Sequence, residues 1–163
     1  MQRNAEKLII LQGNPGIGKT TTLLQVIDFL RNERGFVALN PPQRGRDQRV
    51  LLKNNQGFSI AICTAGDSLE IIEENYRFFL KHECDVMVSA CSINVTTHMR
   101  GSQTNQAKTG LIGFASGYWK SYEVHFNQDS EHVKIFTLYS QEDVGSMVQR
   151  VVEEVLVDEW RGL

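Results

Sequence analysis

The segment GNPGIGKT, from Gly13 to Thr20, combines residue types that suit the binding of a polyphosphate. Its glycines allow backbone N–H groups to surround an anion, because no side chain blocks their approach. Lys19 adds a positive charge that can reach phosphate oxygens, and the Thr20 hydroxyl is a suitable ligand for Mg²⁺. We call this segment the glycine loop. The predicted ligand-binding residues are Gly13, Asn14, Pro15, Gly16, Ile17, Gly18, Lys19, Thr20 and Thr21.

The residues on either side predict the strand and the helix that such a loop requires. The run KLIILQG before the loop is short and apolar, which is typical of a buried strand. After the loop, Leu23, Ile27 and Leu30 keep helical spacing, and Gly35 follows as a stop signal. A helix that begins at the loop directs its positive end at a bound phosphate. The alternative interpretation of the segment is a glycine-rich turn without a ligand. If the loop does bind phosphate, we expect the Lys19 side chain to be exposed when no ligand is bound.

With the full spacing G-x-x-x-x-G-K-[ST] in this context, the first third of the chain resembles the P-loop NTPase superfamily. The resemblance implies that Lys19 contacts the β- and γ-phosphates of a nucleoside triphosphate and that Thr20 binds Mg²⁺. It also implies a three-layer P-loop NTPase fold and hydrolysis of the triphosphate, which we expect to be ATP. Asn14 stands where the partitioning ATPases have a second lysine, so that subgroup is not favoured.

In a second segment, the runs RVLLK and FSIAI flank NNQG and predict a β-hairpin, and the second run leads into CTAG. This segment is similar to the Ras-like small GTPases. The third strand of those GTPases ends in D-T-A-G, and Cys63 stands here in place of the aspartate. A thiol does not replace a carboxylate beside Mg²⁺, which prefers oxygen ligands. The sequence also lacks an N-K-x-D motif for reading guanine, so specificity for GTP is not supported.

The rest of the chain alternates between strand-like and helical patterns. This alternation predicts a single α/β domain, residues 1–163, with a mainly parallel sheet, one β-hairpin and helices on both faces. Short apolar runs predict strands at 36–42, 49–53, 58–62, 85–91 and 133–140. Helical spacing predicts helices at 68–82, at 107–122 and from 144 to 156.

A P-loop enzyme usually needs a carboxylate near the metal, and Asp67 in TAGD is the first candidate for binding metal or orienting water. It follows a predicted strand, and Gly66 would let the backbone approach the phosphates. The alternative is a capping box, with Asp67 as the N-cap and Glu70 at the third helical position. Asp85 begins its strand and would lie at the wrong end of the sheet. Asp47 would reach the site only if its loop folds over it.

Phosphoryl transfer also develops negative charge that an arginine can neutralise. Arg100 is the first candidate, because it lies in the long polar loop 93–106 after a core strand, where a lid could close. The alternatives are Arg44, Arg46 and Arg49 in the stretch RGRDQR. For each of these arginines, the competing interpretation is an ordinary solvated surface residue.

Composition narrows the classes of partner. The net charge of −2 gives no general reason to expect nucleic acid, and no apolar run is long enough to cross a membrane. Cys63, Cys84 and Cys91 form no CxxC pair and predict buried thiols in a reducing compartment. The histidines show no metal-ligand spacing. We therefore expect a cytoplasmic protein whose partner is a nucleoside triphosphate, with a protein partner left open.

Three functions follow from these residues. The first is Mg²⁺-dependent hydrolysis of a nucleoside triphosphate. The second is a nucleotide or small-molecule kinase, although loop 93–106 offers only Arg100 as a lid arginine. The third is an interaction module with little turnover, whose hairpin and TAGD segment report the bound nucleotide to a partner; the missing aspartate at Cys63 favours this one.

Overall fold

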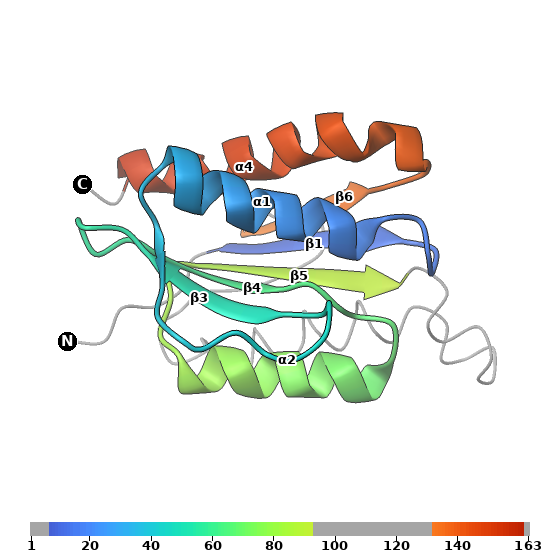
Figure 1. Ribbon diagram of the computed structural model, residues 1–163, viewed down its shortest axis with the longest axis horizontal. Coiled ribbons are helices and arrows are strands. Elements are labelled where there is room, and N and C mark those ends of the chain that lie inside the picture. Colours follow the sequence, from blue (N-terminus) through green and yellow to red (C-terminus); the bar gives the residue numbers. More distant parts are fainter. Residues whose placement is uncertain (1–6, 93–131, 162–163) are drawn as a thin grey trace.

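A six-stranded sheet runs through the centre of the computed structural model, which describes residues 7–92 and 132–161 (Figure 1). The strand order is β2-β3-β4-β5-β1-β6. The strands are β1 (Lys7–Gly13), β2 (Val37–Ala38), β3 (Arg49–Lys53), β4 (Ser59–Cys63), β5 (Val86–Ser92) and β6 (Val133–Thr137). The helices are α1 (Lys19–Glu33), α2 (Leu69–Lys81) and α4 (Val144–Arg161), with a short 3₁₀ turn η3 (Gln141–Asp143) before α4.

The sheet is mixed, so the prediction of a mainly parallel sheet holds only for part of it. β1 is parallel to β5 and β6, and β4 is parallel to β5. β3 is antiparallel to both β2 and β4. The reason is the short connection on each side of β3, because a parallel pair needs a crossover of a dozen or more residues. The predicted hairpin of β3 and β4 is confirmed.

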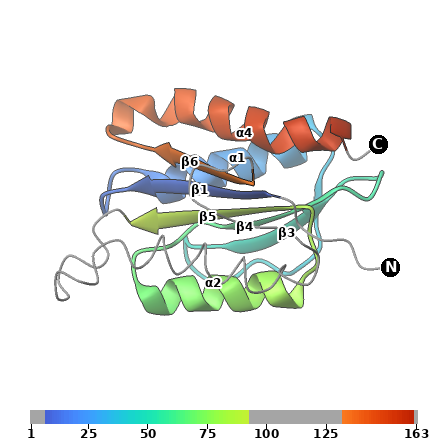
Figure 2. The same cartoon turned by 180° about the vertical axis from the view of Figure 1, so that it is seen from behind.

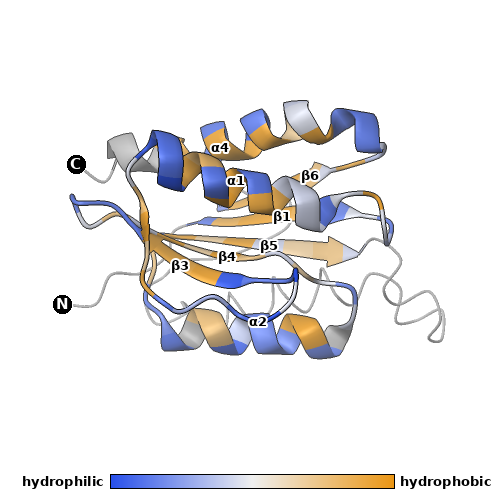
Figure 3. Cartoon of the chain, in the orientation of Figure 1, coloured by the Kyte–Doolittle hydropathy of each residue, from blue (hydrophilic) through white to orange (hydrophobic). Residues whose placement is uncertain are grey.

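Helices cover both faces of the sheet, as predicted. α1 and α4 lie on one face and α2 lies on the other (Figures 1 and 2). The side chains of β1 alternate between the two cores: Ile9 packs in the cluster with α1 and α4, and Leu8 packs in the cluster with Phe79 of α2. Because both faces are covered, the strands are hydrophobic almost without interruption, as Figure 3 shows along β4 and β5.

Most of the predicted elements are confirmed within one or two residues at each end, including β3, α2 and β5. β2 and β6 end earlier than the predicted runs 36–42 and 133–140, and α4 continues beyond residue 156 to Arg161. The predicted helix at 107–122 and the loop 93–106 lie outside the described residues. Within the described part of the chain, no helix has the length and apolar character needed to cross a membrane.

The carboxyl ends of β4, β5, β1 and β6 share one edge of the sheet, because these strands are parallel. β1 leads from this edge into α1 on one face, and β4 leads from it into α2 on the other. Connections that leave to opposite faces open a crevice at the strand ends, which is where ligands bind in open α/β sheets. β3 runs in the opposite direction, so loop 39–48 before it reaches the same edge.

Candidate functional site

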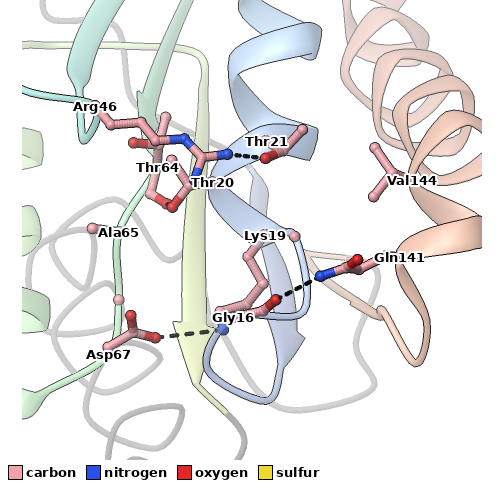
Figure 4. Close-up of a pocket in the computed structure, with 12 residues that line it drawn as sticks. Gly16, Lys19, Thr20, Thr21, Arg46, Thr64, Ala65, Asp67, Gln141 and Val144 are labelled. Carbon is pink, nitrogen blue, oxygen red and sulfur yellow. Dashed lines mark hydrogen bonds and ion pairs between the residues drawn. The ribbon is translucent and has the colours of Figure 1, made fainter.

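A cavity of about 590 Å³ opens at this edge of the sheet, above the glycine loop (Figure 4). Its volume lies within the range of roughly 300–1,000 Å³ that is usual for small-molecule sites. Residues from the glycine loop, loop 39–48, the segment after β4 and the start of α4 surround it. The lining residues are Gly16, Gly18, Lys19, Thr20, Thr21, Arg46, Thr64, Ala65, Gly66, Asp67, Gln141 and Val144.

The glycine loop turns directly from β1 into α1. Gly18 is the N-cap of α1 and has φ 116°, a left-handed conformation that favours glycine, so no side chain caps the first turn of the helix. The Nε2 atom of Gln141 donates a hydrogen bond of 3.1 Å to the carbonyl oxygen of Gly16 and ties the loop to the start of α4. The N-terminus of α1 therefore faces the cavity with its positive dipole end.

Lys19 is buried at the centre of this loop, with 5% of its surface exposed, so the expectation of an exposed lysine was wrong. Its Nζ atom donates hydrogen bonds to the carbonyl oxygens of Gly13 at 2.9 Å and Asn14 at 3.0 Å. The same atom lies 3.4 Å from Oδ1 of Asp67. The loop carbonyls hold the ammonium group in place, and Lys19 lines the cavity (Figure 4).

Asp67 is not a helix cap, so the capping-box interpretation was wrong. The N-cap of α2 is Ser68, whose Oγ atom accepts a 3.2 Å hydrogen bond from the backbone N–H of Ile71. The side chain of Asp67 is 54% exposed, and it pairs with Lys19 from across the cavity. This carboxylate is therefore free of any capping role and faces the cavity.

Gly66 lines the cavity and also makes a close backbone contact with β5. A Cβ atom at this position would lie 1.9 Å from the carbonyl oxygen of Ala90, within the backbone of β5. The carbonyl oxygen of Gly66 accepts a 2.9 Å hydrogen bond from the backbone N–H of Ser92. The absence of a side chain thus lets the segment after β4 lie against the end of β5, which in turn sets the position of Asp67.

Loop 39–48 brings to the site two residues that the sequence offered only as alternatives, Asp47 and Arg46. The Thr20 hydroxyl lies 3.3 Å from Oδ1 of Asp47 and 3.1 Å from the carbonyl oxygen of Thr64, and it can donate to either. The guanidinium of Arg46 donates a hydrogen bond to Oγ1 of Thr21 and lines the cavity. The close spacing of arginine and aspartate in RGRDQR was the available signal, but nothing local predicts that this loop folds over the site.

The end of β4 carries no acid. Cys63 is fully buried, and burial raises the pKa of its thiol well above the ordinary value, although the nearby Arg49 charge acts in the opposite direction. The thiol therefore stays protonated at neutral pH and is a poor ligand for Mg²⁺. Cys84 and Cys91 are buried free thiols as well, as predicted.

The other predicted charged residues lie elsewhere. Asp85 is at the amino end of β5, where its Oδ2 atom accepts a 2.8 Å hydrogen bond from the backbone N–H of Ser59, so its exclusion from the site is confirmed. Arg49 donates to Asn75 and Glu74 of α2, away from the glycine loop. Arg100 lies outside the described residues.

The described residues contain no group of three or more His, Cys, Asp or Glu side chains that could hold a metal ion. Three oxygen atoms lie close together at Thr20: its own hydroxyl, a backbone carbonyl and one carboxylate.

Comparison of the chain with protein-family models, with curated proteins and with solved structures finds no match.

Proposed function

We propose that the protein binds a nucleoside triphosphate together with Mg²⁺ in the 590 Å³ cavity and hydrolyses it. The observation that carries this proposal is the position of Lys19. Lys19 lines the cavity, and its ammonium lies between the glycine loop and an acid that follows another strand. A strand, a glycine loop and a helix in this order, with helices on both faces of the sheet, also support a three-layer P-loop NTPase fold.

Three side chains at the cavity suit parts of phosphoryl transfer to water, those of Lys19, Arg46 and Asp67. Lys19 and the N–H groups at the start of α1 would bind phosphate oxygens. Arg46 already lines the cavity and would neutralise charge in the transition state, the part first considered for Arg100. Asp67 would accept a hydrogen bond from the attacking water. The water oxygen bonds to the γ-phosphorus as the bond to the β–γ bridging oxygen breaks, giving a nucleoside diphosphate and phosphate, and the proton that the water loses passes to solvent.

The fit of Mg²⁺ rests on the oxygen atoms at Thr20. Mg²⁺ prefers oxygen ligands and is usually bound by a few protein groups, water and substrate phosphates. The Thr20 hydroxyl is such a group, and it lies on the lining of the cavity beside two further oxygens. When bound, the ion would offset negative charge on the phosphates.

Calorimetry and phosphate release test the proposal. We expect wild-type protein to bind MgATP and to release phosphate, and Lys19→Ala to lose at least tenfold in affinity or turnover. Lys53→Ala, at the exposed end of β3, is the matched control and should behave as wild type. Because Lys19 is buried, a melt of each variant must accompany the measurement. Equal binding by the Lys19 variant and wild type would contradict the proposal.

The base is expected to be adenine, or to be recognised weakly. This expectation rests on the missing N-K-x-D motif. Competition between ATP and GTP for the same labelled triphosphate measures it directly, and a strong preference for GTP would contradict it.

One observation favours the kinase as a second candidate. A cavity of about 250 Å³ adjoins the first, and both are lined by Ala65. Its other lining residues include Arg44, Arg49 and Asp47, which suit a small polar acceptor. Phosphate release that needs no acceptor favours the hydrolase, whereas transfer that depends on an added acceptor favours the kinase. Tight binding with negligible turnover would instead favour the interaction module.

A further inference from the structure

Asp47, in loop 39–48, lies next to the hydroxyl of Thr20. The Thr20 hydroxyl lies between two acceptors from separate segments, Oδ1 of Asp47 at 3.3 Å and the carbonyl oxygen of Thr64 at 3.1 Å. A threonine hydroxyl, a carboxylate and a carbonyl are all oxygen ligands of the kind that Mg²⁺ accepts. The structure brings these atoms together although they are far apart in the sequence.

We propose that Asp47 is the carboxylate that binds Mg²⁺ with Thr20, directly or through a bound water. This inference rests on the proposed function, since the phosphates of the nucleotide would supply further ligands. It reassigns the metal role first considered for Asp67. Asp47 lines the 250 Å³ cavity, and its Oδ1 atom lies 3.3 Å from the hydroxyl of Thr20, which lines the 590 Å³ cavity.

The two acids occupy different parts of the site. Asp67 pairs with Lys19 at 3.4 Å and follows β4, whereas Asp47 meets the hydroxyl of Thr20. The ion pair makes Asp67 the partner of the phosphate-binding lysine. Cys63, which stands where a strand-end carboxylate would serve a metal, is a buried neutral thiol. Asp47 is thus the acid placed to serve the metal.

The position of Asp47 is built into the fold by the residue that follows it. The backbone N–H of Gln48 donates a 2.7 Å hydrogen bond to Oγ1 of Thr64, and the backbone N–H of Thr64 donates a 2.9 Å bond to the carbonyl oxygen of Gln48. This reciprocal pair extends the β3–β4 ladder by one step beyond Arg49 and Cys63. The pairing of β3 with β4 therefore fixes the position of Asp47, which comes one residue before this reciprocal pair.

Loop 39–48 is also closed by its own side chains. Oε1 of Gln48 accepts a hydrogen bond from the backbone N–H of Gln43, and Nε2 of Gln48 donates to the carbonyl oxygens of Gln43 and Gly45, each at 3.0 Å. Arg49 then anchors the start of β3 to Asn75 of α2 by a 2.8 Å bond. A loop held in this way presents its carboxylate with little further ordering on metal binding.

Metal affinity, measured apart from turnover, tests the inference. The probe is Mn²⁺ in electron paramagnetic resonance, titrated into protein that carries a non-hydrolysable ATP analogue. We expect Asp47→Asn to weaken Mn²⁺ binding at least tenfold, while analogue affinity in EDTA stays within twofold of wild type. Asp67→Asn should leave Mn²⁺ affinity within twofold, and so should Asp28→Asn, which removes a charge from the exposed face of α1.

Variants of Thr20 provide the second arm. Thr20→Ala should lose Mn²⁺ affinity as Asp47→Asn does, and Thr20→Ser, which keeps the hydroxyl, should restore it. Mn²⁺ affinity that is unchanged in Asp47→Asn, or that falls in Asp67→Asn instead, would overturn this inference and leave the proposed function standing. Failure of wild type to bind the analogue at any metal concentration would overturn the proposed function and this inference with it.

Discussion

The ammonium nitrogen of Lys19 lies 3.4 Å from Oδ1 of Asp67, although the two residues follow different strands of the sheet. The lysine side chain is 5% exposed and the aspartate side chain is 54% exposed, so the pair links a buried cation to a half-exposed carboxylate. Because the carboxylate is half-exposed, we expect the pair to be worth only about 0–1 kcal/mol of stability. The main effect of the pair is to place the Lys19 ammonium beside the Asp67 carboxylate at the cavity.

Replacing Asp67 by asparagine should separate this positional role from stability. We expect the free energy of unfolding to change by at most about 1 kcal/mol, because the Asp67 carboxylate is half-exposed and Lys19 keeps its hydrogen bonds to two loop carbonyls. Turnover should fall by roughly a hundredfold, the scale for losing one positioned electrostatic group. Steady-state phosphate release and urea unfolding on one preparation measure both. Unchanged turnover would remove Asp67 from the catalytic assignment.

Ser68→Ala should show the opposite pattern. The hydroxyl of Ser68 caps α2, and loss of a serine cap costs about 1 kcal/mol of stability. Turnover should stay near the wild-type value, because Ser68 is not among the residues that line the cavity. Ser68→Asp keeps a capping oxygen and should restore most of the stability. A stability loss in Asp67→Asn that matched the loss in Ser68→Ala would contradict the assignment of the cap.

Gly66→Ala tests the close contact between the segment after β4 and β5. Its new Cβ atom would lie 1.9 Å from the carbonyl oxygen of Ala90, and backbone cannot move aside as a flexible side chain can. We expect a loss of about 1–3 kcal/mol, the range for overpacking, together with weaker nucleotide binding as Asp67 shifts.

Gly145→Ala is the matched control for this variant. Gly145 lies in α4, and a Cβ atom there would meet nothing within 4 Å. Alanine is the better helix former, so this variant should gain up to about 1 kcal/mol. Urea unfolding compares the two variants, and equal stability of both would show that the Gly66 contact is unimportant.

His82 predicts a dependence of stability on pH. Burial lowers the pKa of His82 below its ordinary value of 6.5, and the charge of Lys81 lowers it further. The unfolded chain therefore binds the proton more readily than the folded chain does, so this contribution to stability is present above about pH 6.5 and is lost as pH falls through the folded pKa. The ring also packs on Phe78, with ring centroids 4.6 Å apart.

The variant His82→Gln isolates this contribution. Urea midpoints at pH 7.5 and at pH 5.5 should fall less steeply with acid in the variant than in wild type, because glutamine does not titrate. The difference between the two slopes removes the effect of other titrating groups. Parallel slopes would show that His82 takes no part in the pH dependence.

Local sequence was enough to predict the glycine loop and the elements around it. The apolar run before Gly13 and the helical spacing after Thr20 depend on residues that lie next to one another in the chain, so β1 and α1 could be assigned directly. The β3–β4 hairpin was predictable for the same reason, because its turn lies between two short apolar runs. Even the burial of Cys63 followed from the apolar run that contains it.

The arrangement of acids around the loop was not predictable in this way. The capping box at Asp67 was a plausible local pattern, but the chain begins α2 one residue later, because Gly66 is pressed against β5 and Ser68 takes the capping geometry. Lys19 was expected to be exposed, and its burial results from carbonyl groups of the loop folding around it. The first outcome depends on a contact between segments that are far apart in the sequence, and the second depends on the backbone path of the loop, which residue types alone do not fix.

The sequence by itself determined which residues are predicted to bind phosphate, since that prediction rests only on the types and spacing of residues 13–21. Only the tertiary structure decided which acid stands beside Thr20. β3 pairs antiparallel with β4, so the start of β3 and the loop before it lie at the carboxyl edge of the sheet. The local pattern predicts this antiparallel hairpin, but the place of the hairpin in the sheet relative to β1 depends on pairing between distant strands. For that physical reason Asp47 meets the Thr20 hydroxyl at 3.3 Å, and its own neighbours in the chain could not predict it.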